Sequence, residues 1–173
     1  MISDAIAVFL TLEAAPVRFC SRFYIATLRS KVRCLSCRGR VARGRLAAEP
    51  EGARVTVVEG DFFRDPLPDG HDVLIVANTV HVLSATHNLE LLRNMRARAA
   101  PQTRLLLVDL WMDASRTQPP AAPIMSGEFL VIPGEGQAYG EDEAEDWLAQ
   151  TGWRKLERRP LAGPASVIIA EAA

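Results

Sequence analysis

The chain has 173 residues, a length that fits one domain, and its 49% of hydrophobic and 24% of charged residues are ordinary for a soluble globular protein. Its apolar runs are shorter than the ~20 residues of a membrane helix, and its three cysteines all lie before residue 38. This composition indicates neither a membrane span nor a disulfide-stapled secreted scaffold. The apolar stretch Ala5–Leu12 has no basic residue before it, which argues against a secretory signal, so the expected location is the cytoplasm.

The formal net charge of −1 conceals two chemically different parts. Residues 1–48 carry nine Lys or Arg against two acids, whereas residues 49–173 carry eleven against nineteen. We therefore expect a basic N-terminal segment of uncertain structure over 1–48 and a separate acidic part over 49–173. Within the first, Ala5–Ala15 fits a helix, Arg22–Cys34 fits a strand or a helix, and Arg38–Arg45 fits a solvated basic linker.

The basic segment raises two binding hypotheses that its sequence supports poorly. Arg29–Arg45 is rich in arginine but lacks the interleaved aromatic residues and the recognisable module of a nucleic-acid binder. The pair Cys34-x-x-Cys37 has no second such pair and no histidine at a zinc-ligand spacing. We expect neither nucleic acid nor a metal ion as a ligand.

From Arg54 onward, strand-like and helix-like segments alternate. Runs of apolar and β-branched residues predict strands over 54–59, 72–77, 104–110 and 166–170, and an alternating pattern predicts an edge strand over 154–159. Apolar residues at spacings of three and four predict a helix over 88–100 with Asn88 as its N-cap, and an acid-rich start predicts another over 141–151. This alternation indicates an α/β fold around a mainly parallel sheet.

The segment Gly60-Asp61-Phe62-Phe63 follows the first of these strands directly. Ligands of doubly wound folds bind at the carboxyl ends of the strands. A glycine there allows close backbone approach, a carboxylate can accept from an exocyclic amine, and an aromatic ring can stack on a base. A strand-end turn whose phenylalanines belong to the core also explains this tetrapeptide, and on these residues alone it is the better interpretation.

His81 follows one predicted strand, and Asp109, 28 residues further along the chain, ends the next one. If these strands are parallel neighbours, both side chains lie at one edge of the sheet, where a carboxylate can orient an imidazole that acts as a general base. A capping or core histidine explains His81 better when it is considered alone. The pairing with Asp109 makes the two interpretations equal.

Taken together, GDFF (60–63), DVLIVANTVH (72–81) and RLLLVDL (104–110) resemble, in order and spacing, the catalytic domain of a known enzyme family. This is the class I S-adenosylmethionine-dependent O-methyltransferase family, the small-molecule type of bacterial natural-product pathways and of plant caffeate enzymes. The resemblance runs from Arg54 to Glu171 and includes Gly152-Trp153 and a closing antiparallel strand pair. It implies an incomplete Rossmann-like methyltransferase sheet, because only the C-terminal part of the domain is matched.

The resemblance also implies residue roles and a cofactor, S-adenosylmethionine. Gly60, Asp61 and Phe62 match the residues that hold the adenine end of the cofactor. His81 matches the general base that takes the proton from the acceptor hydroxyl, and Asp109 matches the acid that steadies it. Met125 and Phe129 fall in the segment that lines the acceptor pocket. The implied partner is a small, aromatic metabolite with a hydroxyl group.

Several departures from the family pattern put activity in doubt. The family's His-Asp-Trp reads His81-Val82-Leu83 here, and the second acid beside the base falls at Ala138. No GxGxG loop and no ribose-binding acid precede Arg54, and the N-terminal domain through which the family forms homodimers is absent. We therefore expect a truncated enzyme that binds the cofactor weakly, with a sheet edge left unpaired unless residues 1–48 cover it. The alternatives are a degenerate, non-catalytic domain and, from the basic segment alone, a nucleic-acid-associated protein.

Overall fold

The computed structural model describes residues 7–10, 32–36, 55–61, 63–65, 67, 71–131 and 135–173. Its strands are β1 (Ala7–Leu10), β2 (Val32–Ser36), β3 (Val55–Glu59), β4 (Val73–Ala77), β5 (Arg104–Asp109), β6 (Trp153–Pro160) and β7 (Ser166–Ala172). Its helices are the short 3₁₀ helix η3 (Val80–Val82), α3 (Ala85–Arg98), α4 (Ala121–Val131) and α5 (Glu141–Gln150). No helix within these ranges is long and apolar enough to cross a membrane.

The strands form one seven-stranded sheet in the order β3-β2-β1-β4-β5-β7-β6. Strands β1 to β5 run parallel to one another, whereas β7 is antiparallel to both β5 and β6. All five residues of β4 are buried, which is why this strand is a continuous apolar run in the sequence. The predicted α/β class is confirmed, with a mainly parallel sheet and a C-terminal antiparallel pair, and β4 and β5 are neighbours as expected.

The basic N-terminal segment contributes more to this sheet than its sequence indicated. β1 lies between β2 and β4 and pairs with both, and β2 pairs with β3. The helix predicted over Ala5–Ala15 is therefore wrong at Ala7–Leu10, while the strand alternative for Arg22–Cys34 is right from Val32 onward. A run of four apolar residues fits a buried strand or a buried helix equally well, so periodicity alone does not separate the two. No sheet edge is left bare beside β4.

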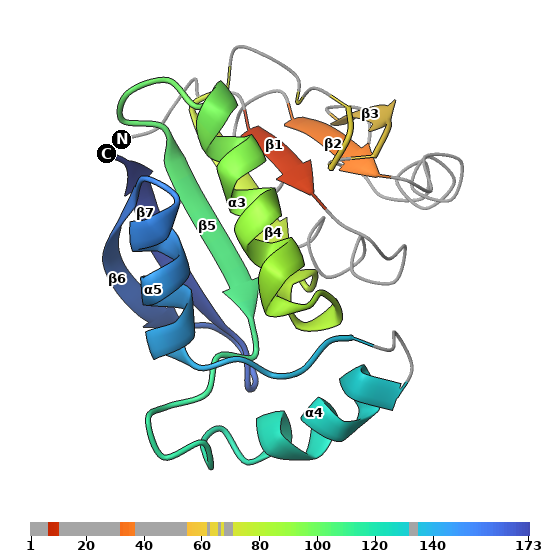
Figure 1. Ribbon diagram of the computed structural model, residues 1–173, viewed down its shortest axis with the longest axis vertical. Coiled ribbons are helices and arrows are strands. Elements are labelled where there is room, and N and C mark those ends of the chain that lie inside the picture. Colours follow the sequence, from red (N-terminus) through yellow and green to blue (C-terminus); the bar gives the residue numbers. More distant parts are fainter. Residues whose placement is uncertain are drawn as a thin grey trace.

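The helices occupy two places around the sheet (Figure 1). α3 and α5 lie side by side on one face, and buried residues from both helices form one core cluster with those of β4, β5 and β7. α4 lies apart from them, beyond the carboxyl ends of β4 and β5. The main core thus supports the sheet from one side, and α4 is placed over the edge at which ligands of such folds bind.

Local hydrogen bonds fix where α3 and α5 begin. Ser84 is the N-cap of α3, and its Oγ accepts from the His87 N–H at 3.2 Å. The helix thus begins earlier than predicted, and the assignment of Asn88 as its N-cap is wrong. α5 begins after Gly140, whose N–H donates to the Glu143 carboxylate at 2.8 Å. Acids in this first turn are favoured by the positive end of the helix dipole.

Candidate active site

The carboxyl ends of β4 and β5 bring the polar residues of the candidate site together. The two strands pair in parallel, with Ala77 opposite Val108, so the residues that follow them meet at one edge. Asn78 leaves β4 with a φ of 48°, a left-handed conformation that asparagine tolerates better than most residues. Its N–H still donates to the Val108 carbonyl at 3.0 Å. The chain then turns into η3, which carries His81.

His81 and Asp109 form a close pair at this edge. His81 Nδ1 lies 2.7 Å from Asp109 Oδ1, and the two side chains are only 13% and 3% exposed. Two backbone N–H groups fix the carboxylate, since Leu110 donates to Oδ1 at 2.8 Å and His81 to Oδ2 at 3.3 Å. Because a carboxylate oxygen accepts, Nδ1 carries the proton and Nε2 is the basic nitrogen of the ring. The predicted proximity of His81 and Asp109 is confirmed, while their chemical roles remain predictions.

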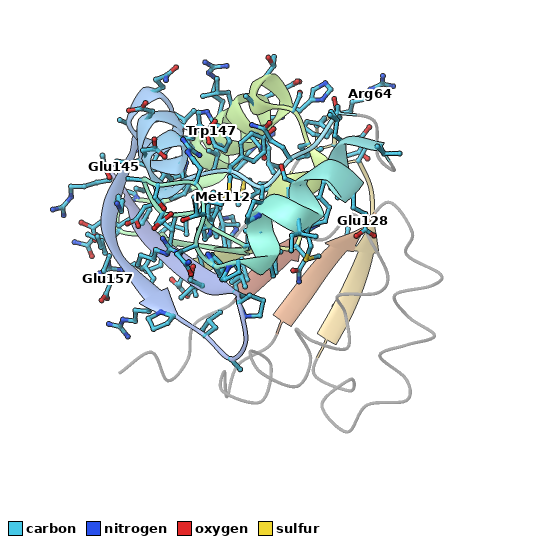
Figure 2. The ribbon with its side chains drawn as sticks, turned by 90° about the horizontal axis from the view of Figure 1, so that it is seen from below. Arg64, Met112, Glu128, Glu145, Trp147 and Glu157 are labelled. Carbon is cyan, nitrogen blue, oxygen red and sulfur yellow. The ribbon has the colours of Figure 1, made fainter. Side chains whose placement is uncertain are left out.

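Phe129 of α4 covers the imidazole. The two rings are stacked, with centroids 4.0 Å apart and planes inclined by 25°. Phe129 belongs to a small apolar cluster with Leu110, Met112, Ala122 and Ala138, against which Met125 packs. Figure 2 looks onto this edge of the sheet and shows Met112 beside α4. Of the two residues predicted to line an acceptor pocket, Phe129 stacks on His81, and Met125 packs against the cluster to which Phe129 belongs.

The segment before α5 packs closely against η3. A Cβ added at Gly136 would lie 2.0 Å from the His81 carbonyl oxygen, so only glycine fits at this contact. Ala138, where the family has a second acid, is buried, and its N–H donates to Ser126 Oγ of α4 at 3.1 Å. The sequence analysis did not identify Gly136, because the sequence around a glycine does not show whether another part of the backbone approaches it closely.

Asp61 makes several local hydrogen bonds directly after β3. Asp61 Oδ1 accepts from the Phe63 N–H at 2.9 Å, and the Asp61 N–H donates to Asp65 Oδ2 at 2.7 Å. The Asp61 side chain is 46% exposed, with Oδ2 3.7 Å from Arg64 Nε. Phe62 lies outside the described residues. The hydrogen bonds of Asp61 with its neighbours therefore agree with the strand-end turn hypothesis. Because the Asp61 carboxylate is partly exposed, it can also accept from a ligand.

The other histidines do not join His81 in a metal site. His87 Nδ1 lies 2.8 Å from Glu135 Oε2 in a partly exposed ion pair, and His71 is buried elsewhere. Among the described residues there is no group of three or more His, Cys, Asp or Glu that could hold a metal ion. Cys34 lies in β2, and Cys37 lies outside the described residues.

A parallel sheet closed by an antiparallel hairpin, with an acid-supported histidine at the end of β4, defines a methyltransferase-like α/β domain. Residues 36–154 match the family model of the O-methyltransferase domain, and the chain belongs to this family. The match begins at Ser36, upstream of Arg54, where the sequence patterns placed the start of the resemblance.

Individual relatives agree with this assignment. The chain is 29% identical to 3-hydroxy-5-methyl-1-naphthoate 3-O-methyltransferase of Streptomyces sahachiroi, over 73% of this chain and 36% of that protein. It is 30% identical to acetylserotonin O-methyltransferase of Mus musculus, over 71% of this chain and 32% of that protein. The chain thus spans about one third of the length of these curated relatives.

Solved structures show the same fold over nearly the whole chain. Human N-acetylserotonin methyltransferase, in complex with SAM, superposes with a TM-score of 0.82 at 22% identity, covering 97% of this chain and 47% of that one. The structure named LaPhzM gives a TM-score of 0.83 at 22% identity, covering 98% of this chain and 50% of that one. This chain therefore corresponds to about half of the solved proteins.

Proposed function

We propose that this chain is the catalytic part of an S-adenosylmethionine-dependent O-methyltransferase that methylates a hydroxyl group of a small aromatic metabolite. The observation that carries the proposal is the His81–Asp109 pair, 2.7 Å apart at the carboxyl edge of the sheet, in a chain of the O-methyltransferase domain family. The acceptor class rests on relatives such as the naphthoate O-methyltransferase. A hydroxyl on an aromatic ring is acidic enough for a histidine to deprotonate during the transfer.

Each residue of the site would have its own role in such a reaction. His81 Nε2 takes the proton from the acceptor hydroxyl, and Asp109 holds the ring in orientation and stabilises the imidazolium that forms. Phe129 fixes the plane of the imidazole and gives the acceptor an apolar wall. Asp61, with its partly exposed carboxylate, and the backbone at Gly60 would hold the adenine end of the cofactor. When bound, S-adenosylmethionine supplies a methyl group already activated by the positive sulfur.

The test of this proposal is methyl transfer from labelled S-adenosylmethionine to a panel of hydroxynaphthoates and simpler phenols. If the chain transfers methyl groups, His81→Ala should lower the rate by about 10²–10⁴, the usual contribution of a general base. His87→Ala is the matched control, because it removes a histidine that pairs with Glu135 and should leave the rate nearly unchanged. Equal losses in both variants would contradict the assignment of the base.

A second candidate, a degenerate domain without catalysis, is favoured by one specific observation. β1 ends at Leu10, and the chain continues as Thr11–Pro16 without a glycine, where the family has its glycine-rich loop. Such a loop presents backbone N–H groups to the ligand, and its glycines let the backbone approach the ligand closely, whereas Thr11–Pro16 contains no glycine. Losing about two such bonds, at roughly 1.5–3 kcal/mol each, would weaken a micromolar Kd to about millimolar.

Calorimetric titration with S-adenosylhomocysteine, together with the transfer assay, separates the two candidates. We expect weak binding, with a Kd of about 1 mM or more. A Kd in the low micromolar range would show that the N-terminal segment rebuilds the cofactor site, and the degenerate alternative would then be wrong. Weak binding with measurable transfer at high cofactor concentration would support the enzyme with an impaired site.

A further inference from the structure

The turn that carries His81 is held by two buried side chains from other elements. Asn88 of α3 donates from Nδ2 to the Val80 carbonyl at 3.0 Å and to the Leu83 carbonyl at 3.3 Å. Tyr139, from the segment before α5, donates from its hydroxyl to the same Leu83 carbonyl at 2.7 Å. These acceptors lie on both sides of His81, so the two side chains fix the turn at both of its ends.

Both side chains are polar groups buried in the interior. Asn88 is 1% exposed and Tyr139 is 4% exposed. Asn88 Oδ1 is buried with no hydrogen-bond partner in the described part of the chain, a cost that an apolar residue of similar size would avoid. A tyrosine hydroxyl already keeps its proton and can donate at neutral pH, and burial raises the pKa of Tyr139 further, to about 12.

We propose that Asn88 and Tyr139 are positioning residues for His81. By clamping the turn, they hold the imidazole so that its Nδ1–H points at Asp109 and Nε2 remains the basic nitrogen. This inference rests on the proposed role of His81 as a base. It also accounts for how the ring is oriented in a chain that has Ala138 where the family places a second acid.

The proposal is tested by nuclear magnetic resonance of the full chain with isotope-labelled histidine, without any methyl transfer. Tyr139→Phe removes the hydroxyl and keeps the ring, and Asn88→Leu removes the amide and keeps the volume. Thr151→Val is the matched control, because the buried Thr151 hydroxyl donates to the Trp147 carbonyl at 2.7 Å at the opposite end of α5. The readouts are the tautomer of His81, from its ring nitrogen shifts, and the rate at which its Nδ1–H exchanges with solvent.

In the unmodified chain we expect one tautomer with the proton on Nδ1. Each clamp variant should speed the exchange of this proton by about tenfold, which corresponds to about 1.4 kcal/mol, and should populate the other tautomer. Thr151→Val should change neither readout, and the His87 signals serve as an internal reference. The proposal is overturned if both clamp variants leave His81 unchanged, or if Thr151→Val changes it equally. A chain that transfers no methyl group would still give either result, so failure of the proposed function is recognised separately.

Discussion

Replacing Gly136 with alanine should disrupt the turn that carries His81. A Cβ at this position would lie 2.0 Å from the His81 carbonyl oxygen and 2.8 Å from Val82 Cα, whereas real Cβ atoms keep at least 3.0 Å. Both neighbours are backbone atoms, so no side-chain rotation relieves the clash. Either η3 or the segment around Gly136 must move by about 1 Å, and the clamp by Asn88 and Tyr139 resists the first of these movements.

The expected cost follows from these contacts. Forcing extra volume into a packed site costs about 1–3 kcal/mol, and a shifted turn also weakens the bonds to the Val80 and Leu83 carbonyls, worth about 1 kcal/mol each. Gly136→Ala should therefore lower the free energy of unfolding by about 2–4 kcal/mol. Gly127→Ala is the matched control: it lies within α4 with nothing within 4 Å of the added Cβ. It should raise the free energy of unfolding by roughly 0.5–1 kcal/mol, since alanine favours the helix.

Urea unfolding followed by tryptophan fluorescence measures both changes, because the reporters Trp111, Trp147 and Trp153 are all buried. The transition midpoint should fall for Gly136→Ala and rise slightly for Gly127→Ala, with unchanged slopes. The His81 resonances should shift in the first variant only. A Gly136→Ala chain with wild-type stability and an intact Nδ1–H signal would refute the close packing of Gly136 on η3.

Two further changes test the acid response and the stacked ring. A hydrogen bond from Lys155 holds the pKa of Glu141 below its ordinary 4.5, so this ion pair stabilises the fold fully above pH 4.5 and is lost as the pH falls through the folded value. Glu141→Gln should therefore flatten the fall of the urea midpoint on acidification, whereas Glu128→Gln on the exposed side of α4 should not. Phe129→Leu should remove the ring-current shift of the His81 protons and lower the free energy of unfolding by about 1–2 kcal/mol. Unchanged His81 protons in that variant would contradict the stacking.

The sequence predicts those features that depend on burial and strand order. β4 is a continuous apolar run because all five of its residues are buried, and its parallel pairing with β5 places His81 beside Asp109. β1 could not be predicted, because four apolar residues within a longer apolar stretch have no periodicity that distinguishes a strand from a helix. The hydrogen bonds of Asn88 and Tyr139 to the His81 turn could not be predicted for a different reason. Asn88 and Tyr139 bind backbone carbonyls, which every residue possesses, so no partner residue in the sequence indicates the contact.

The candidate site has two halves, the turn that carries His81 and the site that would hold the cofactor, and they depend on different parts of the chain. His81 is positioned by residues between Asn78 and Gly140, which lie on β5, α3, α4 and the segment before α5. A cofactor bound as the family resemblance implies would instead depend on the ends of β1 and β3. α3 contacts both halves, since Asn88 binds the turn of His81 and Asn94 donates to the Phe63 carbonyl at 3.1 Å, but the hydrogen bonds are made by different side chains. Mutation of one of these side chains need not disturb the other half. The orientation of His81 and the affinity for S-adenosylhomocysteine are therefore separate measurements. A well-ordered base in a chain that binds the cofactor weakly would locate the defect in the sequence after β1.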